Sequence, residues 1–364
     1  MKERMHQIRF GTAGLDVYRD YETNSILIPT DGKADILSTA IINGGYREDL
    51  SLVFNHTCSA EECYMLAETY EAHMLALMRR NGFDPACAVG MTTAAQMANC
   101  AVVEKRYQEL TVTALVTAGI EKNGGRAGDP SSFYDPVDRN NLPEPGTINM
   151  ILVIDADIAA GTAERALVMC TEAKTAALQE LLAGSNFSTG IATGSGTDQT
   201  VILTNPSSHL YFEHAGKHSK LGELIGLCVK EAVKKALFLE TGLDARKQFS
   251  VLRRLKRFGV TDESMRGVWE NRCSTALDKE SSSNLIEALD QIPDLVTYTS
   301  LFVHLLDQIQ WGLLTNDCAM GAADTLFRAI GYQTKMRYWD TQEALNEWQY
   351  ALLAAANSEK IEKR

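Results

Sequence analysis

The sequence lacks the segments that would place a chain in a membrane or on nucleic acid. It has no run of eighteen apolar residues, no basic tract of the nucleic-acid kind, and no apolar stretch in its first residues, MKERMHQIRFG. With a net charge of −12 and a pI near 5.1, the chain would be repelled by anionic polymers and membranes. We therefore expect a cytoplasmic protein with no nucleic acid and no membrane as a partner.

Standard chemical motifs are also missing. The eight cysteines include no C-x-x-C pair, which favours reduced thiols over disulfides or a zinc framework. There is no G-x-x-x-x-G-K-[ST] phosphate loop, and Gly194-x-Gly196 lacks the third glycine of a dinucleotide fingerprint. No G-x-S-x-G elbow surrounds Ser195, because Thr193 stands in place of the first glycine. The chain thus carries none of these nucleotide or serine-hydrolase signatures.

What the sequence does contain is a central stretch, residues 146–198, with a pattern of strand, helix and turn. The apolar run Ile148–Ile154 predicts a buried strand, and the periodicity of Ala160–Leu182 predicts a helix. Thr193–Asp198 follows as a turn of glycines and hydroxyl residues ahead of a second strand, Gln199–Thr204. A turn of this composition exposes backbone N–H groups.

Lys174 lies in the middle of the apolar side of the central helix when successive residues are spaced by about 100°. Its simpler interpretation is a lysine that extends past apolar neighbours to solvent. The functional interpretation is a partly desolvated ammonium that faces a pocket, holds an anion or takes part in acid/base chemistry. Glu172 falls on the opposite side, where a solvated or salt-bridged surface residue is the simpler interpretation.

The order of elements predicts an α/β fold, with a mixed β-sheet flanked by helices and followed by an all-helical C-terminal domain. The flanking helices are expected at Ser59–Arg80, Ala160–Leu182 and Lys217–Glu240, and further strands at Ser25–Pro29, Ile36–Ile42, Ser51–Phe54, Ala86–Gly90 and Leu110–Thr117. Beyond Thr241 lie all four tryptophans but only six of the 26 glycines. We therefore predict an α/β domain over residues 1–240 and a helical domain of open role over 241–364.

Two loops and one helix start offer further candidate residues. Asn43-Gly44-Gly45 has the composition of a turn that needs positive φ. The glycine-rich loop Ala118–Asp129 is either a flexible connector or a binding loop, with Arg126 as its most suitable polar contact. His218 begins a helix, whose dipole favours the neutral form of a base, although a packed histidine is the alternative. His214 and His218 have the i,i+4 spacing of a metal pair, but no third ligand follows at a diagnostic distance.

Several ordered groups of residues are similar to the signatures of one known family. They are Leu37-Ser38 with Gly44-Gly45, Val89–Ala94, Val116–Gly119 with Asn123 and Arg126–Asp129, Gly146–Asn149, Thr171–Ala177, Ala192–Asp198 and His218–Glu223. Together they resemble the adenosylcobinamide amidohydrolase (CbiZ) family over about residues 30 to 240. The helical C-terminal residues lie outside this resemblance.

The resemblance implies hydrolysis of the amide between aminopropanol and the corrin ring of adenosylcobinamide, which releases adenosylcobyric acid for corrinoid salvage and remodelling. Amide cleavage needs an activated water or nucleophile, donors for the oxyanion and an acid for the departing amine. The turn that begins at Thr193 can supply the donors, His218 or Asp198 a base, and Lys174 a charge or a proton. The catalytic candidates are Lys174, His218 and Asp198, and the candidates for contact with the corrinoid substrate are Asn43, Gly44, Gly45, Asn123, Arg126, Asp129, Thr147, Asn149, Glu172, Thr193, Gly194, Ser195, Gly196 and Thr197. No metal or cofactor belongs to this expectation, and a homo-oligomer stays open.

Three alternatives stay open beside this interpretation. Gly146-Thr147 is similar to a self-cleavage point that would free Thr147 as an N-terminal nucleophile, although Thr147 more simply starts a strand. A corrinoid-binding or delivery protein without catalysis would keep the glycine-rich loops but would not need Lys174 or His218. A phosphate-ester or nucleotide enzyme would use the turn Thr193–Asp198 as an anion-binding nest.

Overall fold

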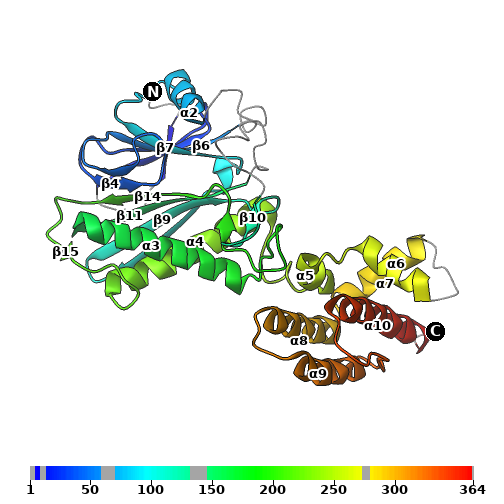
Figure 1. The fold of residues 1–364 in the computed structure, drawn as a ribbon. Helices are drawn as coiled ribbons and strands as arrows, with labels where there is room; N and C mark the ends of the chain where they lie inside the picture. Colours follow the sequence, from blue (N-terminus) through cyan, green and yellow to red (C-terminus); the bar gives the residue numbers. More distant parts are fainter. Residues whose placement is uncertain (1–4, 9–13, 59–69, 132–145, 273–278, 363–364) are drawn as a thin grey trace. The chain divides into compact units, whose positions relative to one another are not determined.

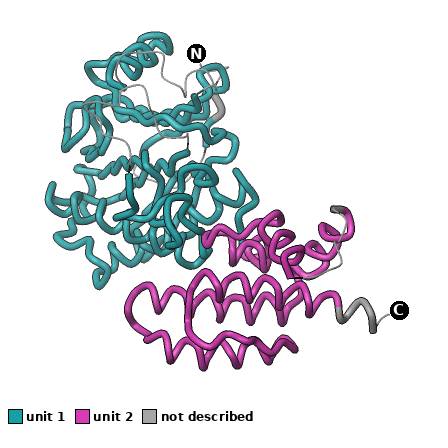
Figure 2. The backbone as a smooth tube through the Cα atoms, turned by 45° about the vertical axis from the view of Figure 1, so that its right-hand side comes forward, with its two compact units in different colours: residues 1–244 teal, residues 245–364 magenta. Residues whose placement is uncertain are grey.

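The computed structural model describes residues 5–8, 14–58, 70–131, 146–272 and 279–362. Contacts divide the chain into two compact units, Met1–Asp244 and Ala245–Arg364, drawn in teal and magenta in Figure 2. The predicted α/β class is confirmed by the first unit, and the described elements of the second are helical. All the candidate site residues belong to the first unit.

Two β-sheets lie face to face in the first unit, with helices on both outer sides (Figure 1). The apolar cluster between the sheets draws on both, with Ile28 and Val53 from one sheet and Ile151 and Val201 from the other. One further cluster lies outside each sheet, against the helices. The first unit is therefore a four-layer α/β/β/α sandwich. The outer helices are α2 (Tyr70–Arg80) on one side and α3 (Ala160–Glu180) with α4 (Lys220–Thr241) on the other.

The strands divide between two main sheets, a division that the sequence does not predict because an apolar strand pattern does not reveal which sheet a strand joins. The five-stranded sheet has the order β1 (Met5–Ile8), β2 (Val17–Asp20), β3 (Ser25–Pro29), β6 (Leu52–Thr57) and β7 (Ala88–Thr93). The six-stranded sheet has the order β5 (Gly45–Arg47), β4 (Asp35–Ser38), β14 (Gln199–Thr204), β11 (Ile148–Ile154), β9 (Leu110–Ala118) and β8 (Ala101–Tyr107). Two short pairs join β10 (Gly124–Gly125) to β13 (Gly194–Ser195) and β12 (Asp157–Ile158) to β15 (Tyr211–Phe212).

Local differences from the predicted elements have physical reasons. The edge strand β8 was not predicted, because its charged segment, residues 104–106, interrupts the apolar pattern. The strand predicted at Ile36–Ile42 ends at Ser38, after which the chain turns through Asn43 and Gly45, with φ of 53° and 83°. The turn predicted there is thereby confirmed. The first part of the helix predicted from Ser59 lies outside the described residues.

The unit formed by β11, α3 and β14 positions the central chemistry. β11 and β14 are parallel neighbours, and α3 returns the chain between them across one face of the sheet. Along β11, Met150 and Leu152 pack against the helices, while Ile151 and Val153 pack between the two sheets. This alternation is the pleat of a strand that is buried on both faces. It directs Asn149 into the layer between the sheets, where it is fully buried.

The second unit is an assembly of helices around aromatic side chains, which confirms the predicted helical C-terminal region. Trp348 is fully buried and stacks on Phe302, with ring centroids 4.5 Å apart. Phe327 meets Trp348 edge-on, with centroids 5.2 Å apart. The helices are α5 (Val251–Leu255), α6 (Asp262–Arg272), α7 (Lys279–Asp290), α8 (Pro293–Gln310), α9 (Asn316–Ala329) and α10 (Thr341–Glu362).

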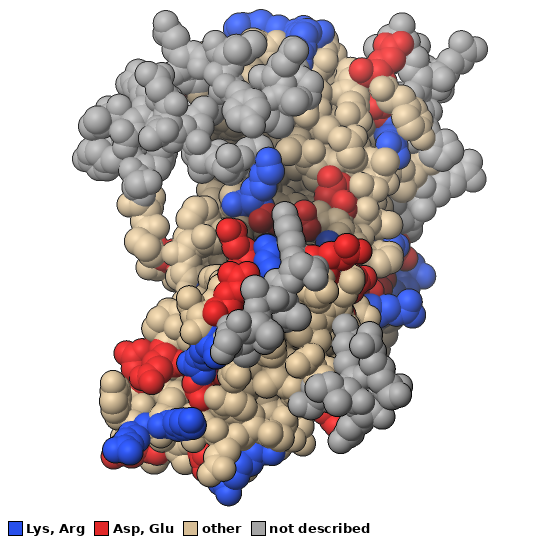
Figure 3. Space-filling model, turned by 90° about the vertical axis from the view of Figure 1, so that its right-hand side faces the viewer, with Lys and Arg blue, Asp and Glu red and all other residues tan. Residues whose placement is uncertain are grey.

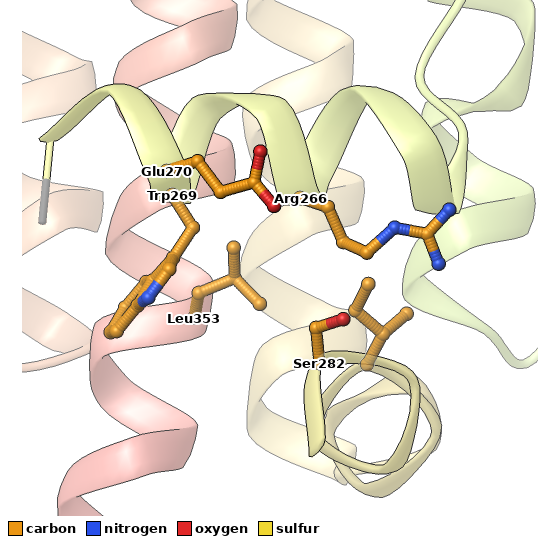
Figure 4. A pocket seen from close by; sticks show the side chains of 6 residues that line it. Arg266, Trp269, Glu270, Ser282 and Leu353 are labelled. Atoms are coloured by element: carbon orange, nitrogen blue, oxygen red, sulfur yellow. The ribbon is translucent and has the colours of Figure 1, made fainter. Parts of the chain in front are cut away.

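A small pocket opens among α6, α7 and α10 of the second unit (Figure 4). Arg266, Trp269 and Glu270 of α6 line it together with Ser282 and Leu353. The indole N–H of Trp269 has no hydrogen-bond partner among the described residues. The family resemblance does not reach this unit.

The surface of the molecule carries charges of both signs. On the face drawn in Figure 3, basic and acidic side chains are interspersed, and neither sign forms a continuous patch. Among the described residues, no helix combines the length and apolar character required to cross a membrane.

Candidate active site

One edge of the six-stranded sheet gathers the loops that carry most of the candidate residues. β9 ends at Ala118 beside Ile148, where β11 begins, and Asn149 lies beside Gln199 at the start of β14. β4 is antiparallel to β14, so it ends at the same edge and leads into the turn Asn43–Gly45. The segments after 118, before 148, before 199 and after 38 therefore meet at this edge, which we call the loop edge.

The two glycine-rich loops pair with each other at the loop edge. Gly124 lies opposite Ser195 and Gly125 opposite Gly194 in the antiparallel pair of β10 and β13. Thr193 extends this pairing, because its N–H donates to Gly125 O at 2.8 Å and its hydroxyl accepts from Ala127 N at 2.9 Å. A Cβ atom on Gly194 would lie 2.3 Å from Asp198 Oδ2, so only glycine fits there.

Lys174 and Asp198 form a buried ion pair at the loop edge. The Lys174 ammonium donates to Asp198 Oδ2, and the two side chains are 9% and 10% exposed. Asp198 Oδ2 also accepts from Ser195 N at 3.0 Å, while Oδ1 accepts from the Ser195 hydroxyl and, at 2.8 Å, from Ile148 N. The carboxylate thus ties α3 to the turn and to the start of β11. Lys174 is a buried, paired cation and does not extend to solvent.

Thr147 and its neighbours form a compact hydrogen-bonded group beside this ion pair. The Gly146 carbonyl accepts from Asn123 Nδ2 at 2.5 Å and from Thr197 Oγ1 at 2.8 Å. The Thr147 hydroxyl donates to Thr197 O at 2.8 Å. Thr147 is 4% exposed and Asn123 is 1% exposed. Direct contacts therefore bring together Asn123, Thr147 and Thr197, three of the candidate residues.

A buried polar network continues from Thr147 into the layer between the sheets. The Thr147 hydroxyl lies 3.2 Å from Asn149 Oδ1, and Asn149 Nδ2 donates to Asn55 Oδ1 at 2.9 Å. Asn55 Nδ2 donates in turn to Thr117 Oγ1 at 2.9 Å. Neither Asn55 nor Thr117 is among the candidate residues, because Asn55 follows the predicted strand Ser51–Phe54 and Thr117 ends the predicted strand Leu110–Thr117. The signal that can reveal them is a polar side chain within a strand buried on both faces, where a hydrogen-bond partner is required.

Arg126 and Asp129 shape the loop that carries Asn123. Asp129 Oδ2 accepts from Arg126 N at 2.8 Å and from the Ser185 hydroxyl at 2.5 Å. Burial raises the pKa of Asp129, but hydrogen bonds from Ser185, Ser188 and Arg126 N outweigh it and hold the pKa below its ordinary value. The Arg126 guanidinium lies within 3.4 Å of Ile191 O. Both residues close the loop against the segment that follows α3.

His218 lies at the far end of the sheet from the Lys174–Asp198 pair. The ammonium of its neighbour Lys220 lies 4.6 Å from the centroid of the Tyr107 ring, in the hairpin between β8 and β9. α4 then runs for 22 residues, about 33 Å, toward the loop edge. Near its end, the Glu240 side chain lies beside Gly119. The structure therefore does not bring His218 together with the other two catalytic candidates.

Glu172 is likewise placed apart from Lys174. Its carboxylate pairs with Lys217 at 2.8 Å, with side chains 39% and 55% exposed for Glu172 and Lys217. The hydrogen bond from Lys217 lowers the pKa of Glu172. The pair is a partly exposed surface ion pair between α3 and the segment before α4. The turn Asn43–Gly45, in contrast, lies at the loop edge, where Asn43 Nδ2 donates to Pro85 O and Ala88 O at 2.8 Å each.

The described part of the chain contains no group of three or more His, Cys, Asp or Glu residues arranged to hold a metal ion. His214 and His218 are both exposed. The polar groups at the loop edge instead include hydroxyls, amides, the Lys174–Asp198 ion pair and the charged side chains of Arg126 and Asp129. This donor set suits hydrogen bonding and charge stabilisation.

The fold and the loop edge define an α/β domain with a glycine-lined polar site built on a buried lysine and aspartate. A family model described as adenosylcobinamide amidohydrolase matches residues 11–245, which is more than half of the chain. The chain therefore belongs to the adenosylcobinamide amidohydrolase family. The whole loop edge lies inside the matched region.

The comparisons with known proteins also include one sequence relative and one solved structure. The uncharacterized protein MJ1613 of Methanocaldococcus jannaschii is 32% identical over 227 residues, an alignment that covers 59% of this chain and 86% of that protein. The crystal structure of the PH0078 protein from Pyrococcus horikoshii OT3 is 13% identical, with a TM-score of 0.29 over 70% of this chain and 90% of that one.

Proposed function

We propose that this protein hydrolyses the amide bond between aminopropanol and the corrin ring of adenosylcobinamide, giving adenosylcobyric acid for corrinoid salvage and remodelling. The observation that carries the proposal is the buried Lys174–Asp198 pair beside the paired glycine-rich loops, within the region matched to the family. In the reaction, one oxygen of water is added to the carbonyl carbon. The carbon–nitrogen bond breaks, and aminopropanol leaves with a proton on its nitrogen.

Lys174 is the residue we assign to charge stabilisation. The tetrahedral intermediate of amide hydrolysis carries a negative oxygen, and a preorganised cation in a water-poor site stabilises that charge strongly. Lys174 is held in place by Asp198 and is 7% exposed, so its position is fixed before the substrate arrives. Asp198 acts as the residue that orients it, because both carboxylate oxygens are already occupied by donors.

We assign substrate positioning to the two glycine-rich loops. Gly196 and Thr197 are exposed at the tip of the turn, and Arg126 is partly exposed on the neighbouring loop. Small residues let the backbone approach a large ring closely. The corrin ring carries several other amides that must survive, so the site requires orientation of one amide carbonyl toward Lys174.

The test is incubation of the purified protein with adenosylcobinamide, with and without a chelator, followed by mass spectrometry of aminopropanol and the corrinoid acid. We expect both products, whether or not chelator is present. Lys174→Met should lower kcat by about a hundredfold or more while corrinoid binding persists. The matched control Lys217→Met removes a lysine of the exposed pair and should leave kcat unchanged. Corrinoid binding without either product would replace the proposal with a binding protein.

A further inference from the structure

The carbonyl of Gly146 has an arrangement of donors that a strand does not require. Two side chains, Asn123 Nδ2 at 2.5 Å and Thr197 Oγ1 at 2.8 Å, donate to this one oxygen. Two preorganised donors on one carbonyl oxygen are the geometry that stabilises the oxyanion when a carbonyl carbon is attacked. Here the polarised carbonyl belongs to the protein's own peptide bond between Gly146 and Thr147.

The hydroxyl of Thr147 is the nucleophile nearest in sequence to that carbonyl. It belongs to the residue on the nitrogen side of the same peptide bond, and it donates to Thr197 O at 2.8 Å. Thr197 therefore contacts both sides of the bond, with its hydroxyl on the Gly146 oxygen and its carbonyl on the Thr147 hydroxyl. The same hydroxyl oxygen also lies 3.2 Å from Asn149 Oδ1.

Two features around Gly146 are unfavourable and are not explained by packing alone. Asn123 Oδ1 is buried and has no hydrogen-bond partner among the described residues, which is unfavourable for a polar atom taken out of water. A Cβ atom on Gly146 would lie 2.4 Å from that oxygen and 3.0 Å from Gly119 O, so only glycine fits before Thr147. An unpartnered buried polar group held in a tight site is typical of a functional constraint.

We propose that the protein cleaves its own Gly146–Thr147 peptide bond and so makes Thr147 an N-terminal nucleophile. The Thr147 hydroxyl oxygen attacks the Gly146 carbonyl carbon, and Asn123 and Thr197 stabilise the oxyanion. The carbon–nitrogen bond breaks, the hydroxyl proton ends on the Thr147 nitrogen, and an ester joins Gly146 to the Thr147 side chain. Water hydrolyses that ester, which leaves a carboxylate on Gly146 and a free amine and hydroxyl on Thr147.

The freed Thr147 supplies the group that the amidohydrolase site otherwise lacks, a step that rests on the proposed function. An N-terminal amine can take the proton from its own threonine hydroxyl, which activates that oxygen for attack on a substrate amide. Asp198 is unsuited to this role because its two oxygens already accept four hydrogen bonds. Asp198 instead fixes Ile148 N, one residue from the nucleophile, at 2.8 Å.

The inference is tested by the mass of the purified, denatured protein. Wild type should give fragments 1–146 and 147–364, with the second beginning at an unblocked Thr147. Thr147→Ser keeps the hydroxyl and should give the same fragments, whereas Thr147→Ala should give one intact chain. Asn123→Ala removes one oxyanion donor and should slow cleavage by about a hundredfold or more, so an intact precursor accumulates and converts with time. Circular dichroism of each variant establishes that it is folded.

Thr162→Ala is the matched control, because Thr162 is a similarly buried threonine whose hydroxyl donates to the backbone Glu213 O at 2.9 Å. It should be cleaved like wild type. An intact wild-type chain that releases aminopropanol would overturn self-cleavage and leave the proposed amidohydrolase function standing. Fragments without aminopropanol release would support self-cleavage and contradict the proposed amidohydrolase function. A cleaved Thr147→Ala chain would also overturn the inference of self-cleavage.

Discussion

Replacing Asp198 by asparagine should destabilise the first unit far more than replacing Lys174 by methionine. Asp198→Asn turns one acceptor oxygen into an NH2 group and leaves the ammonium of the buried Lys174 beside a neutral partner. Breaking a buried ion pair in this way costs about 3–5 kcal/mol. Lys174→Met removes the cation instead, and the carboxylate keeps its donors Ser195 N, the Ser195 hydroxyl and Ile148 N. We expect about 1–3 kcal/mol for that loss.

The assay must report on the first unit alone. All four tryptophans lie after residue 268, in the second unit, so tryptophan fluorescence follows only that unit. Hydrogen exchange of peptides from β11 and β14, measured as a function of urea, gives the opening free energy of the first unit. The fluorescence transition serves as the internal reference and should not move. Lys217→Met, at the exposed pair, should cost under about 1 kcal/mol.

Equal losses in the two variants, or a larger loss for Lys174→Met, would refute the reasoning. Such a result would mean that the three remaining donors do not hold the Asp198 carboxylate. A loss below about 1 kcal/mol for Asp198→Asn would mean that the pair is solvated in solution.

Three further predictions concern stability and reactivity. Asp307→Asn breaks a buried, two-bond pair with an arginine and should cost the second unit about 3–5 kcal/mol by tryptophan fluorescence, whereas Asp324→Asn, in an exposed pair, should cost under about 1 kcal/mol. Burial raises the pKa of the Cys170 thiol to about 12, so a thiol reagent at pH 8 should label exposed Cys318 before Cys170, and labelling of Cys170 before Cys318 by peptide mass spectrometry would contradict this. Because the pKa of Asp129 is lowered on folding, its stabilisation is present above the unfolded value of about 3.9 and is lost as pH falls through the folded value. Asp129→Asn should therefore flatten the acid-unfolding curve, and an unchanged curve would exclude this contribution.

Continuous apolar runs are the part of the fold that the sequence predicts best. β3, β11 and β14 begin and end where predicted, because each is a short apolar run with turn residues at its ends. The division into two sheets could not be predicted, because a strand buried on both faces has the same pattern in either sheet.

For the candidate site, the sequence predicts which face of a helix is buried better than it predicts at which end of the sheet a residue lies. The helical wheel places Lys174 among buried residues correctly, but its partner Asp198 follows only from the parallel pairing of β11 and β14. The same kind of wheel places His218 at the start of a buried stripe, but this was wrong, because His218 is exposed and α4 begins at Lys220. A wheel also does not show at which end of the sheet a helix starts. The contact between Lys220 and Tyr107 places the start of this helix at the hairpin between β8 and β9, and such a tertiary contact cannot be read from the sequence.

The measurement that tests the central claim most directly is turnover of adenosylcobinamide by the wild-type protein in water enriched in heavy oxygen. The account predicts release of aminopropanol without label and a corrinoid acid that carries one heavy oxygen in its new carboxylate, because hydrolysis adds water oxygen to the carbonyl carbon. No acid, or label in the aminopropanol, would contradict amide hydrolysis by this protein.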